Sequence, residues 1–379
     1  MVKIATLNKI SPAGLSHLTD NYTITENTDE ANAILVRSQA MHDMDFSGNL
    51  LSIARAGAGV NNIPLDRCAE EGIVVFNTPG ANANAVKELV LAGMLMAARN
   101  IPDAISWAKG LESDVLKAYE KGKGQFAGTE IAGKTLGVIG LGAIGIKIAN
   151  TAETLGMKVI GYDPFLTINT AHRISNTAEI VNDIKDMLGK CDYITIHVPA
   201  TDATKGMMNK EMFDRMKDGV IFLNFSRDKL VNDADLMAAI DSGKIRKYVT
   251  DFATDALLHY NNVIAIPHLG ASSAEAEDNC ASMAAIQTMD YIENGNIVNS
   301  VNFPAVTLGT KAGTRIAVLS KASDTIISDV TAAMNAKNAV ISNIISKTRG
   351  DYAYTLLETT ADIDSLEIAN DSIIKVRII

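Results

Sequence analysis

The sequence has little cysteine, little basic charge and no long hydrophobic run. Among its 379 residues are only three cysteines, Cys68, Cys191 and Cys280, and this odd, widely spaced set suits a reducing cytosol rather than a disulfide framework. The net charge is −10 and the pI is about 5.1, which argues against nucleic acid or an anionic membrane as a partner. The longest apolar stretch, 89–98, is too short to span a membrane, and the N-terminus has no signal-peptide core. We therefore expect a soluble, cytoplasmic protein.

Two common kinds of site are missing from the pattern as well. No cluster of His, Cys, Asp and Glu has metal-ligand spacing, so we expect no metal, and no G-x-S-x-G motif indicates a serine hydrolase. There is no internal repeat and no low-complexity tract. With 47% hydrophobic residues and this length, the chain is expected to fold into two or three globular domains.

The stretch 134–165 carries the strongest pattern in the chain. An apolar run typical of a buried strand is followed by a glycine-rich turn, a helical pattern, a second apolar run and an acid. In order, these are 135–139, 140–145, 146–155, 159–162 and Asp163. Strand, glycine turn, helix, strand and acid in this order predict a dinucleotide-binding site.

Each glycine of this turn has a physical task. Gly140 allows the tight turn, Gly142 lets the backbone approach a pyrophosphate, and Gly145 lets helix and strand pack closely. The phosphates would bind free N–H groups at the helix start. Asp163 would accept hydrogen bonds from the adenosine ribose, and Pro164-Phe165 supplies no arginine for a 2′-phosphate. The pattern therefore predicts NAD rather than NADP.

Strand-like apolar runs alternate with helical segments through most of the chain, which is typical of parallel sheets with crossover helices. Such runs are 3–6, 33–36, 52–54 and 74–76, and after the acid 193–197, 219–224, 249–251 and 263–266. In 314–379 we expect the order βαββαβ, with the second helix in 362–370. The predicted fold class is α/β, with two Rossmann-like doubly wound parallel-sheet domains and this small ferredoxin-like domain. We expect one domain in 1–95 with 273–305 and the nucleotide domain in 96–272.

Polar side chains follow the strands of the nucleotide domain, at the edge where open parallel sheets bind ligands. They are His197, Asn224, Arg227, Asp251 and His268. The guanidinium of Arg227 could hold a carboxylate and polarise a ketone, and the imidazole of His268 could exchange the proton of a 2-hydroxy acid. Taken alone, a solvated arginine and a structural histidine are the favoured interpretations. Because both follow strands of the sheet that carries the glycine turn, a catalytic pair is favoured.

The first domain offers two further anion-binding patterns. After the strand 52–54, the sequence Gly57-Ala58-Gly59 could present successive N–H groups to a carboxylate, or it is an ordinary tight turn. After the strand 33–36, Arg37-Ser38 could bind a phosphate, or Arg37 is a lone surface residue.

Several motifs together resemble those of a known family. They are R-A-G-A-G-V-N-N at 55–62, V-F-N-T-P at 75–79, the glycine turn through 162–164, T-I-H-V-P at 195–199, N-F-S-R at 224–227 and P-H-L-G-A at 267–271. In order and spacing they resemble the D-isomer-specific 2-hydroxyacid dehydrogenases over about 1–305. Within that family, 125–131 and 301–304 resemble the members that oxidise D-3-phosphoglycerate to 3-phosphohydroxypyruvate, the first step of serine biosynthesis. The C-terminal piece resembles an ACT domain.

The resemblance implies roles for individual residues. Besides the three glycines and Asp163, it implies NAD contacts for Thr78, Ala143, Ile144, Val198, Phe225, Ser226, Asp251, Gly270 and Ala271. It implies that Arg227 binds the substrate carboxylate and carbonyl and that His268 is the acid/base group. It assigns the anionic ends of a phosphorylated 2-hydroxy acid to Arg37, Ser38, Arg55, Gly57, Ala58, Gly59 and Asn61. Lys123 matches a basic position that relatives present across a dimer interface, so we expect a homodimer or a higher homo-oligomer.

The chain departs from the family pattern in two places. The family normally has a glutamate five residues after its strand-end Asp, where it orients the catalytic His; here that position is Ala256, and Asp255 is the expected substitute. The segment 319–324 lacks the Pro-Gly turn and the Asn or His through which relatives bind serine. Regulation and a role limited to assembly therefore both stay open for the ACT-like domain.

Two alternatives to the D-3-phosphoglycerate prediction remain. One is a family member that acts on hydroxypyruvate or glyoxylate. The other is a non-catalytic NAD-sensing protein, which the missing glutamate makes worth considering.

Overall fold

The computed structural model describes all 379 residues, Met1–Ile379, and they form two compact units. We call Ala83–Ser273 the central unit, and Met1–Asn82 together with Ala274–Ile379 the terminal unit. No helix in the structure combines the length and the apolar character that a membrane crossing needs.

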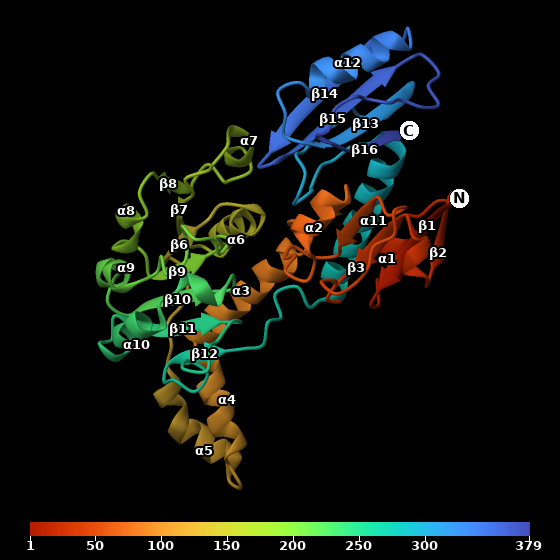
Figure 1. Cartoon of the computed structure of the whole chain (residues 1–379). Helices are drawn as coiled ribbons and strands as arrows, with labels where there is room; N and C mark the ends of the chain where they lie inside the picture. Colours follow the sequence, from red (N-terminus) through yellow and green to blue (C-terminus); the bar gives the residue numbers. More distant parts are fainter. The chain divides into compact units, whose positions relative to one another are not determined.

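The central unit is built on a seven-stranded sheet in which all pairs are parallel (Figure 1). The strands are β6 (Thr135–Ile139), β7 (Lys158–Tyr162), β8 (Glu179–Val181), β9 (Tyr193–Ile196), β10 (Val220–Asn224), β11 (Ile245–Thr250) and β12 (Val263–Ala265). Their order is β12-β11-β10-β9-β6-β7-β8. The chain leaves β6 toward β7 and later returns to β9 on the other side of β6. This reversal creates a switch point at the carboxyl ends of β6 and β9, where open α/β sheets bind ligands.

Helices cover both faces of this sheet, because its strands are apolar on both sides. Phe222 and Tyr248 belong to one buried cluster with residues of α9 and α10, while Leu223 and Val249, one position on, belong to another with residues of α3 and α6. The helices are α3 (Ala83–Ala98), α4 (Ile101–Lys109), α5 (Val115–Gly122), α6 (Ala143–Thr154), α7 (Ile168–Ala171), α8 (Lys185–Leu188), α9 (Lys210–Arg215) and α10 (Asp233–Asp241), with the 3₁₀ helices η2 (Lys123–Phe126) and η3 (Asp228–Leu230).

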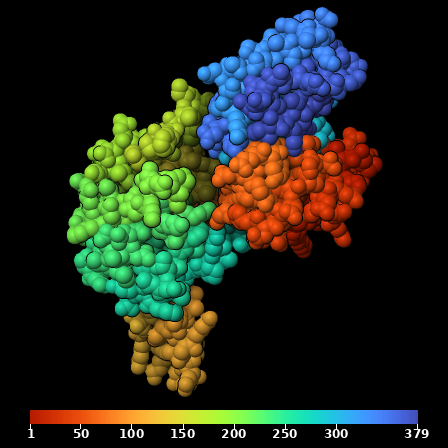
Figure 2. All heavy atoms as spheres, in the orientation of Figure 1, coloured from red at the N-terminus to blue at the C-terminus, as the bar shows by residue number.

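The first unit boundary differs from the sequence-based expectation. We expected the nucleotide domain to begin at residue 96, after the apolar helix, but the structure divides between Asn82 and Ala83, before α3. The reason is packing: α3 contacts α6, β10 and β11, so it belongs to the central unit. Beyond it, α4, α5 and η2 form an arm in which Trp107 contacts the rings of Tyr119 and Phe126, and Figure 2 shows this arm projecting from the central unit.

The terminal unit begins with a five-stranded parallel sheet of order β2-β1-β3-β4-β5. Its strands are β1 (Val2–Leu7), β2 (Tyr22–Thr25), β3 (Ala33–Val36), β4 (Ser52–Arg55) and β5 (Val74–Phe76), and its helices are α1 (Pro12–Leu15), η1 (Thr28–Glu30), α2 (Leu65–Glu70) and α11 (Ala274–Asn294). The long helix α11 packs on α1 and on the strands β3, β4 and β5. Its early turns therefore lie near the ends of strands that carry candidate site residues.

The last part of the chain forms a four-stranded antiparallel sheet of order β14-β15-β13-β16. Its elements are β13 (Thr314–Lys321), α12 (Ile326–Ala336), β14 (Ile341–Arg349), β15 (Tyr352–Thr359) and β16 (Ile373–Ile378). The expected second helix in 362–370 is wrong: this segment has no regular structure, although Ile363 and Leu366 are buried. Asp, Ser, Asn and β-branched Ile, which have low helix propensity, make up most of this segment. The expected α/β class, with two parallel sheets and a small antiparallel one, is confirmed.

The C-terminal sheet is not an independent body, because it shares a core with the first sheet. Leu319, Tyr354 and Leu356 join one buried cluster with residues of α11 and β5, while Val318 and Leu357 face α12.

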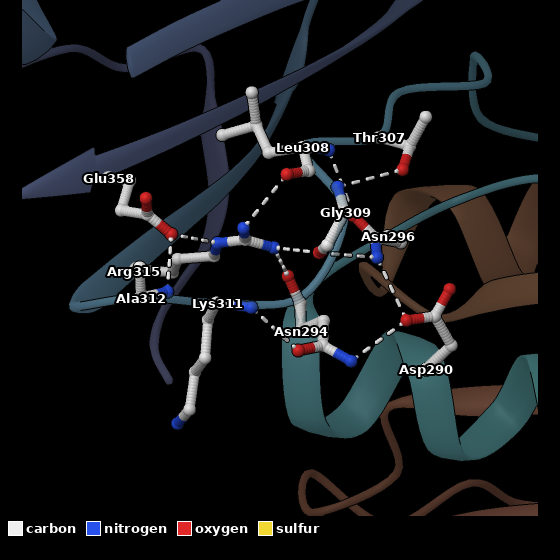
Figure 3. A network of polar contacts seen from close by, with 10 residues as sticks. All are labelled: Asp290, Asn294, Asn296, Thr307, Leu308, Gly309, Lys311, Ala312, Arg315 and Glu358. Atoms are coloured by element: carbon white, nitrogen blue, oxygen red, sulfur yellow. Dashed lines mark hydrogen bonds and ion pairs between the residues drawn. The ribbon is translucent and has the colours of Figure 1, made fainter. Parts of the chain in front are cut away.

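Polar groups complete this contact at the end of α11 (Figure 3). Arg315, only 1% exposed, pairs through Nε with Glu358 at 2.7 Å and donates through Nη1 to the carbonyls of Asn294 and Gly309 at 2.8 and 2.7 Å. The Tyr354 hydroxyl donates to the Gly295 carbonyl at 2.6 Å. The ACT-like sheet therefore caps the carbonyl end of α11, which a helix cannot satisfy by itself.

Candidate active site

The glycine turn of the central unit has the geometry that its sequence predicts. Gly140 has φ +93°, and a Cβ there would lie 2.5 Å from the carbonyl oxygen of His197. A Cβ on Gly145 would lie 1.9 Å from the carbonyl oxygen of Gly140, so helix and turn touch through backbone. A Cβ on Gly142 would meet nothing within 4 Å, which leaves open space where a pyrophosphate would approach.

The helix start and the acid beside this turn also fit a dinucleotide. No side chain caps α6 at Gly142, so the N–H groups of its first turn, at Ala143 and Ile144, are left for phosphate oxygens. Asp163 accepts from the backbone N–H of Leu141 at 2.8 Å and of Phe165 at 2.9 Å. Each carboxylate oxygen keeps a lone pair for a ribose hydroxyl.

A buried amide holds the loop that presents Arg227. Asn224, at the end of β10, is fully buried; its amide donates to the Arg227 carbonyl at 2.9 Å and its oxygen accepts from the Ser226 N–H at 3.1 Å. The Ser226 hydroxyl donates to the Ile196 carbonyl at 2.7 Å, which ties the loop to β9. The backbone of Arg227 is therefore fixed while its side chain is exposed.

Asp251, directly after β11, is a buried carboxylate with an unfilled oxygen. It is 3% exposed; Oδ2 accepts from the Gly270 N–H at 3.3 Å, and Oδ1 is buried without a partner. Burial raises the pKa of Asp251 to about 6, against the opposing effects of the Gly270 N–H and the Arg227 charge. An unfilled buried acceptor at a strand end is a place where a ligand donor fits.

His268, in the exposed loop after β12, lies against an aromatic ring that sequence reasoning missed. The imidazole and the ring of Phe252 have centroids 4.3 Å apart at an angle of 43°. Cζ of Arg227 lies 5.3 Å from the centroid of the same ring. The structure therefore brings His268 and Arg227 to one edge of the sheet, with Phe252 in contact with both. No sequence signal distinguishes Phe252 from a core residue at a strand end.

The second strand-end histidine behaves differently. His197 Nε2 lies 2.7 Å from the hydroxyl of buried Thr195, and its Nδ1 is buried without a partner. Burial lowers the pKa of His197 to about 3, so this imidazole is neutral near pH 7 and does not exchange protons there.

The other expected cofactor and catalytic residues of the central unit differ in their exposure. Val198 and Ala271 are half-buried in the loops after β9 and β12, and Asp255 is exposed between β11 and β12. Phe225 is 5% exposed, and a Cβ on Gly93 would lie 2.8 Å from its ring. Because the ring of Phe225 points into the core beside α3, only its backbone is free for a cofactor.

In the terminal unit, the expected phosphate residues follow β3. Nη1 of Arg37 forms an ion pair with Oε1 of Glu277, on α11, at 2.7 Å, with the two side chains 36% and 44% exposed. Ser38 is held by Asn8, whose oxygen accepts from the Ser38 N–H at 2.9 Å. Sequence reasoning missed Glu277 and Asn8, because each is far in sequence from its partner.

The turn after β4 offers fewer free amides than expected. The Gly57 N–H donates to the Arg55 carbonyl at 2.9 Å, whereas the Ala58 and Gly59 N–H groups have no acceptor in the protein. The Arg55 guanidinium covers Gly57, since a Cβ there would lie 2.2 Å from Nη1. Asn61, later in the same loop, is exposed. The Thr78 N–H donates to the Gly57 carbonyl at 3.1 Å, so Thr78 contacts the turn through its backbone.

Lys123 is not part of the terminal unit. It is exposed in η2, on the arm of the central unit, where it pairs with Glu120.

The glycine turn, the uncapped helix and the strand-end acid define the central unit as a dinucleotide-binding Rossmann unit. Comparison with known proteins narrows this class. Residues 91–270 match the family model described as D-isomer specific 2-hydroxyacid dehydrogenase, NAD binding domain. The chain therefore contains the NAD-binding domain of the D-isomer-specific 2-hydroxyacid dehydrogenases, and the predicted family and the NAD cofactor are confirmed.

Individual relatives extend the likeness beyond this domain. The D-3-phosphoglycerate dehydrogenase of Methanocaldococcus jannaschii is 36% identical over 298 residues, 76% of this chain and 55% of that protein. The enzyme of the same name from Bacillus subtilis is 31% identical over 326 residues, 81% of this chain and 60% of that protein. The crystal structure of NAD+-bound 3-phosphoglycerate dehydrogenase from Entamoeba histolytica is 25% identical with a TM-score of 0.61, covering 79% of this chain and 98% of that one. The chain thus spans little more than half the length of the curated relatives it matches.

Proposed function

We propose that the chain is an NAD-dependent dehydrogenase that oxidises D-3-phosphoglycerate to 3-phosphohydroxypyruvate, the first step of serine biosynthesis. One observation carries the proposal: an arginine and a histidine, Arg227 and His268, contact the same ring at the carboxyl edge of an NAD-binding sheet. The similarity to several D-3-phosphoglycerate dehydrogenases supports the substrate.

In the proposed reaction, NAD would supply the hydride acceptor for C2 of the substrate. His268 takes the proton of the C2 hydroxyl, so that its electron pair forms the new carbonyl. The Arg227 guanidinium holds the substrate carboxylate and the oxygen that becomes the carbonyl, using its planar fork of donors. Asp255 is the proposed carboxylate behind His268.

The residues that would hold NAD are those around the glycine turn. The α6 N–H groups receive the pyrophosphate and Asp163 the adenosine ribose. The unfilled Oδ1 of Asp251 is a fitting acceptor for an amide N–H of the cofactor. Contacts from Thr78, Val198, Ser226, Gly270, Ala271 and the Phe225 backbone complete the proposed site.

The terminal unit would bind the anionic ends of the substrate. Arg37 and Ser38 follow one strand and Arg55 the next, so their side chains lie at one edge of the sheet. The two unpaired N–H groups of Ala58 and Gly59 and the side chain of Asn61 add donors for a carboxylate.

Assembly and location are part of the proposal. Ile105, Val115 and Leu116 are exposed on the arm, Leu116 by 82%, which supports a homodimer or higher homo-oligomer in which Lys123 reaches a partner's site. The ACT-like domain would serve assembly or regulation. Three free, buried cysteines support a cytoplasmic location.

The first test is reduction of NAD by the purified protein with D-3-phosphoglycerate. Arg37→Leu should then raise the KM for D-3-phosphoglycerate by about 10- to 100-fold, the value of one charge-assisted hydrogen bond, and change the KM for glyoxylate in the reverse direction much less. Arg215→Leu is the matched control, since Arg215 also pairs with a glutamate, Glu211, but on α9.

Three results would contradict parts of the proposal. A folded, NAD-binding protein that does not reduce NAD with D-3-phosphoglycerate contradicts the substrate. Equal losses with both substrates in Arg37→Leu indicate instead a dehydrogenase of small unphosphorylated 2-hydroxy acids. If wild-type turnover survives in His268→Ala, the assigned acid/base group is wrong.

A further inference from the structure

The position of Phe252 is set by the sheet rather than by its loop. Its backbone N–H donates to the hydroxyl of Thr250 at 3.0 Å, and Thr250 is fully buried at the end of β11. The residue between them, Asp251, is buried and accepts from Gly270. The backbone on the N-terminal side of Phe252 is therefore fixed, and its half-buried ring starts from a rigid base.

Strand order places this ring between the two candidate catalytic side chains. Arg227 follows β10 and His268 follows β12, while Phe252 follows β11, which pairs with both of these strands. Because the carboxyl ends of adjacent parallel strands meet at one edge, a residue just beyond the middle strand lies between the two neighbouring loops. The contacts agree: the ring lies 4.3 Å from the imidazole centroid and 5.3 Å from Cζ of Arg227.

The Arg227 side chain needs such a support. Arg227 and His268 are both exposed and lie in loops. The Arg227 guanidinium makes one hydrogen bond within the protein, from Nη1 to the neighbouring Ser226 carbonyl at 2.6 Å, which does not fix the direction of the other donors. A flat aromatic face restricts both groups, since a guanidinium is attracted to the π-face and an imidazole ring packs against it.

We propose that Phe252 is a positioning residue whose ring orients Arg227 and His268 together for the reaction. The inference rests on the proposed function for the roles of those two side chains. Phe252 itself touches no reacting atom. It holds the general base and the carboxylate-binding group at a fixed separation, and reaction rates are sensitive to misplacement of about 1 Å.

The kinetic test compares Phe252→Leu with Phe252→Tyr. Leucine keeps apolar bulk without the π-face, so kcat should fall and the KM for D-3-phosphoglycerate should rise, each by about 5- to 10-fold, with the KM for NAD unchanged. Tyrosine keeps the ring and should restore both constants. The control is Phe213→Leu, which removes a buried ring that packs on Phe222 in the core of the central unit. This variant should have a lower Tm and an unchanged kcat.

A spectroscopic test does not depend on turnover. The chain has six histidines, so ¹³Cε1-labelled histidine gives six signals, and His268→Gln assigns the one of interest. The ring current of Phe252 should displace this signal, and Phe252→Leu should remove the displacement while Phe252→Tyr keeps it.

The possible results distinguish a failure of the role of Phe252 from a failure of the proposed dehydrogenase activity. Constants for Phe252→Leu within two-fold of wild type, a tyrosine variant as impaired as the leucine variant, or an unchanged His268 signal overturns the role of Phe252. If the wild-type protein itself does not oxidise D-3-phosphoglycerate, the proposed function fails, and the histidine signal still decides whether Phe252 orients His268.

Discussion

Two buried carboxylates, one in each unit, have opposite pKa shifts and different numbers of hydrogen-bond partners. Asp251, in the candidate active site, has one oxygen without a partner, and burial raises its pKa to about 6. Glu358, under the ACT-like sheet, accepts from Arg315 and from the Ala312 N–H, and the arginine lowers its pKa below the ordinary value.

The difference separates a structural site from a ligand site. Around Glu358 each charge has a partner and Arg315 also satisfies helix carbonyls, which is how a buried polar network stabilises a fold. At Asp251 a buried acceptor is left open, which costs stability unless a ligand fills it. We therefore expect substitutions around Glu358 to lower stability, and substitution of Asp251 to raise stability while changing binding and turnover.

The largest effect is expected from Arg315→Met. Loss of the guanidinium leaves Glu358 charged and buried with only the Ala312 N–H as donor, and it removes the Arg315 donor from the Asn294 carbonyl. Breaking a buried pair in this way typically costs about 3–5 kcal/mol in the free energy of unfolding. Urea unfolding measures this loss, while kcat per folded molecule should stay at the wild-type value. Lys210→Met, which breaks the exposed pair with Asp214, should cost at most about 1 kcal/mol. Equal losses in the two variants would show that the network is not a stabilising contact.

Asp251→Asn should raise the free energy of unfolding, whereas Arg315→Met should lower it. The unfolded Asp titrates near 3.9 and the folded one near 6, so the folded state holds its proton longer and the free energy of unfolding falls as the pH rises between these values. The asparagine variant avoids this loss, and at pH 7 it should be more stable than wild type by at most roughly 3 kcal/mol. Below about pH 4 the two should be equal.

Glu358→Gln tests the carboxylate whose pKa is lowered, and its effect on stability should have the opposite pH dependence. Because the folded pKa of Glu358 is lowered, its contribution is fully present above the ordinary carboxylate pKa of about 4.3 and is lost as the pH falls through the folded value. The variant should therefore be less stable than wild type at pH 7, and the difference should shrink in acid. If Asp251→Asn also destabilises at pH 7, the contrast between the two carboxylates is wrong.

A smaller effect is expected at Asp163, the proposed ribose-binding acid. Asp163→Ser keeps a hydroxyl acceptor near the Leu141 N–H but removes the charge that selects a ribose over a 2′-phosphate. The Kd for NAD should rise by about tenfold, the value of one lost charged hydrogen bond, and the preference over NADP should shrink. Calorimetric titration with both nucleotides measures this, and Asp202→Ser, in an exposed loop, is the control.

The sequence predicted the parallel sheets because their strands are buried on both faces. Segments such as 220–224 are continuously apolar and end at a polar residue, so both the strand and its carboxyl end are visible in the sequence. The glycine turn was visible for a similar reason, since each of its glycines meets a steric demand. The roles of Arg227, His268 and the anion-binding residues stay predictions.

What the sequence did not reveal depends on tertiary contacts. The helix α3 is apolar whichever sheet it packs on, so its membership of the central unit could not be read from its residues. Phe252 resembles any core aromatic, and its importance follows only from the order of β10, β11 and β12. The pairing of Glu277 with Arg37 joins positions that only the fold brings together.

That pairing gives the smallest expected effect. Glu277 forms an ion pair with the guanidinium of Arg37, so under the proposed function a substrate phosphate would have to displace this carboxylate. Glu277→Gln keeps the shape and a hydrogen-bond acceptor but removes the competing charge, and because an exposed pair is worth at most about 1 kcal/mol, the KM for D-3-phosphoglycerate should fall about three-fold with kcat unchanged. Steady-state kinetics at low ionic strength measure the change. Glu211→Gln, which pairs with Lys185 on the central unit, should leave KM unchanged. A rise in KM would mean that Glu277 holds Arg37 in its binding position instead of competing for it.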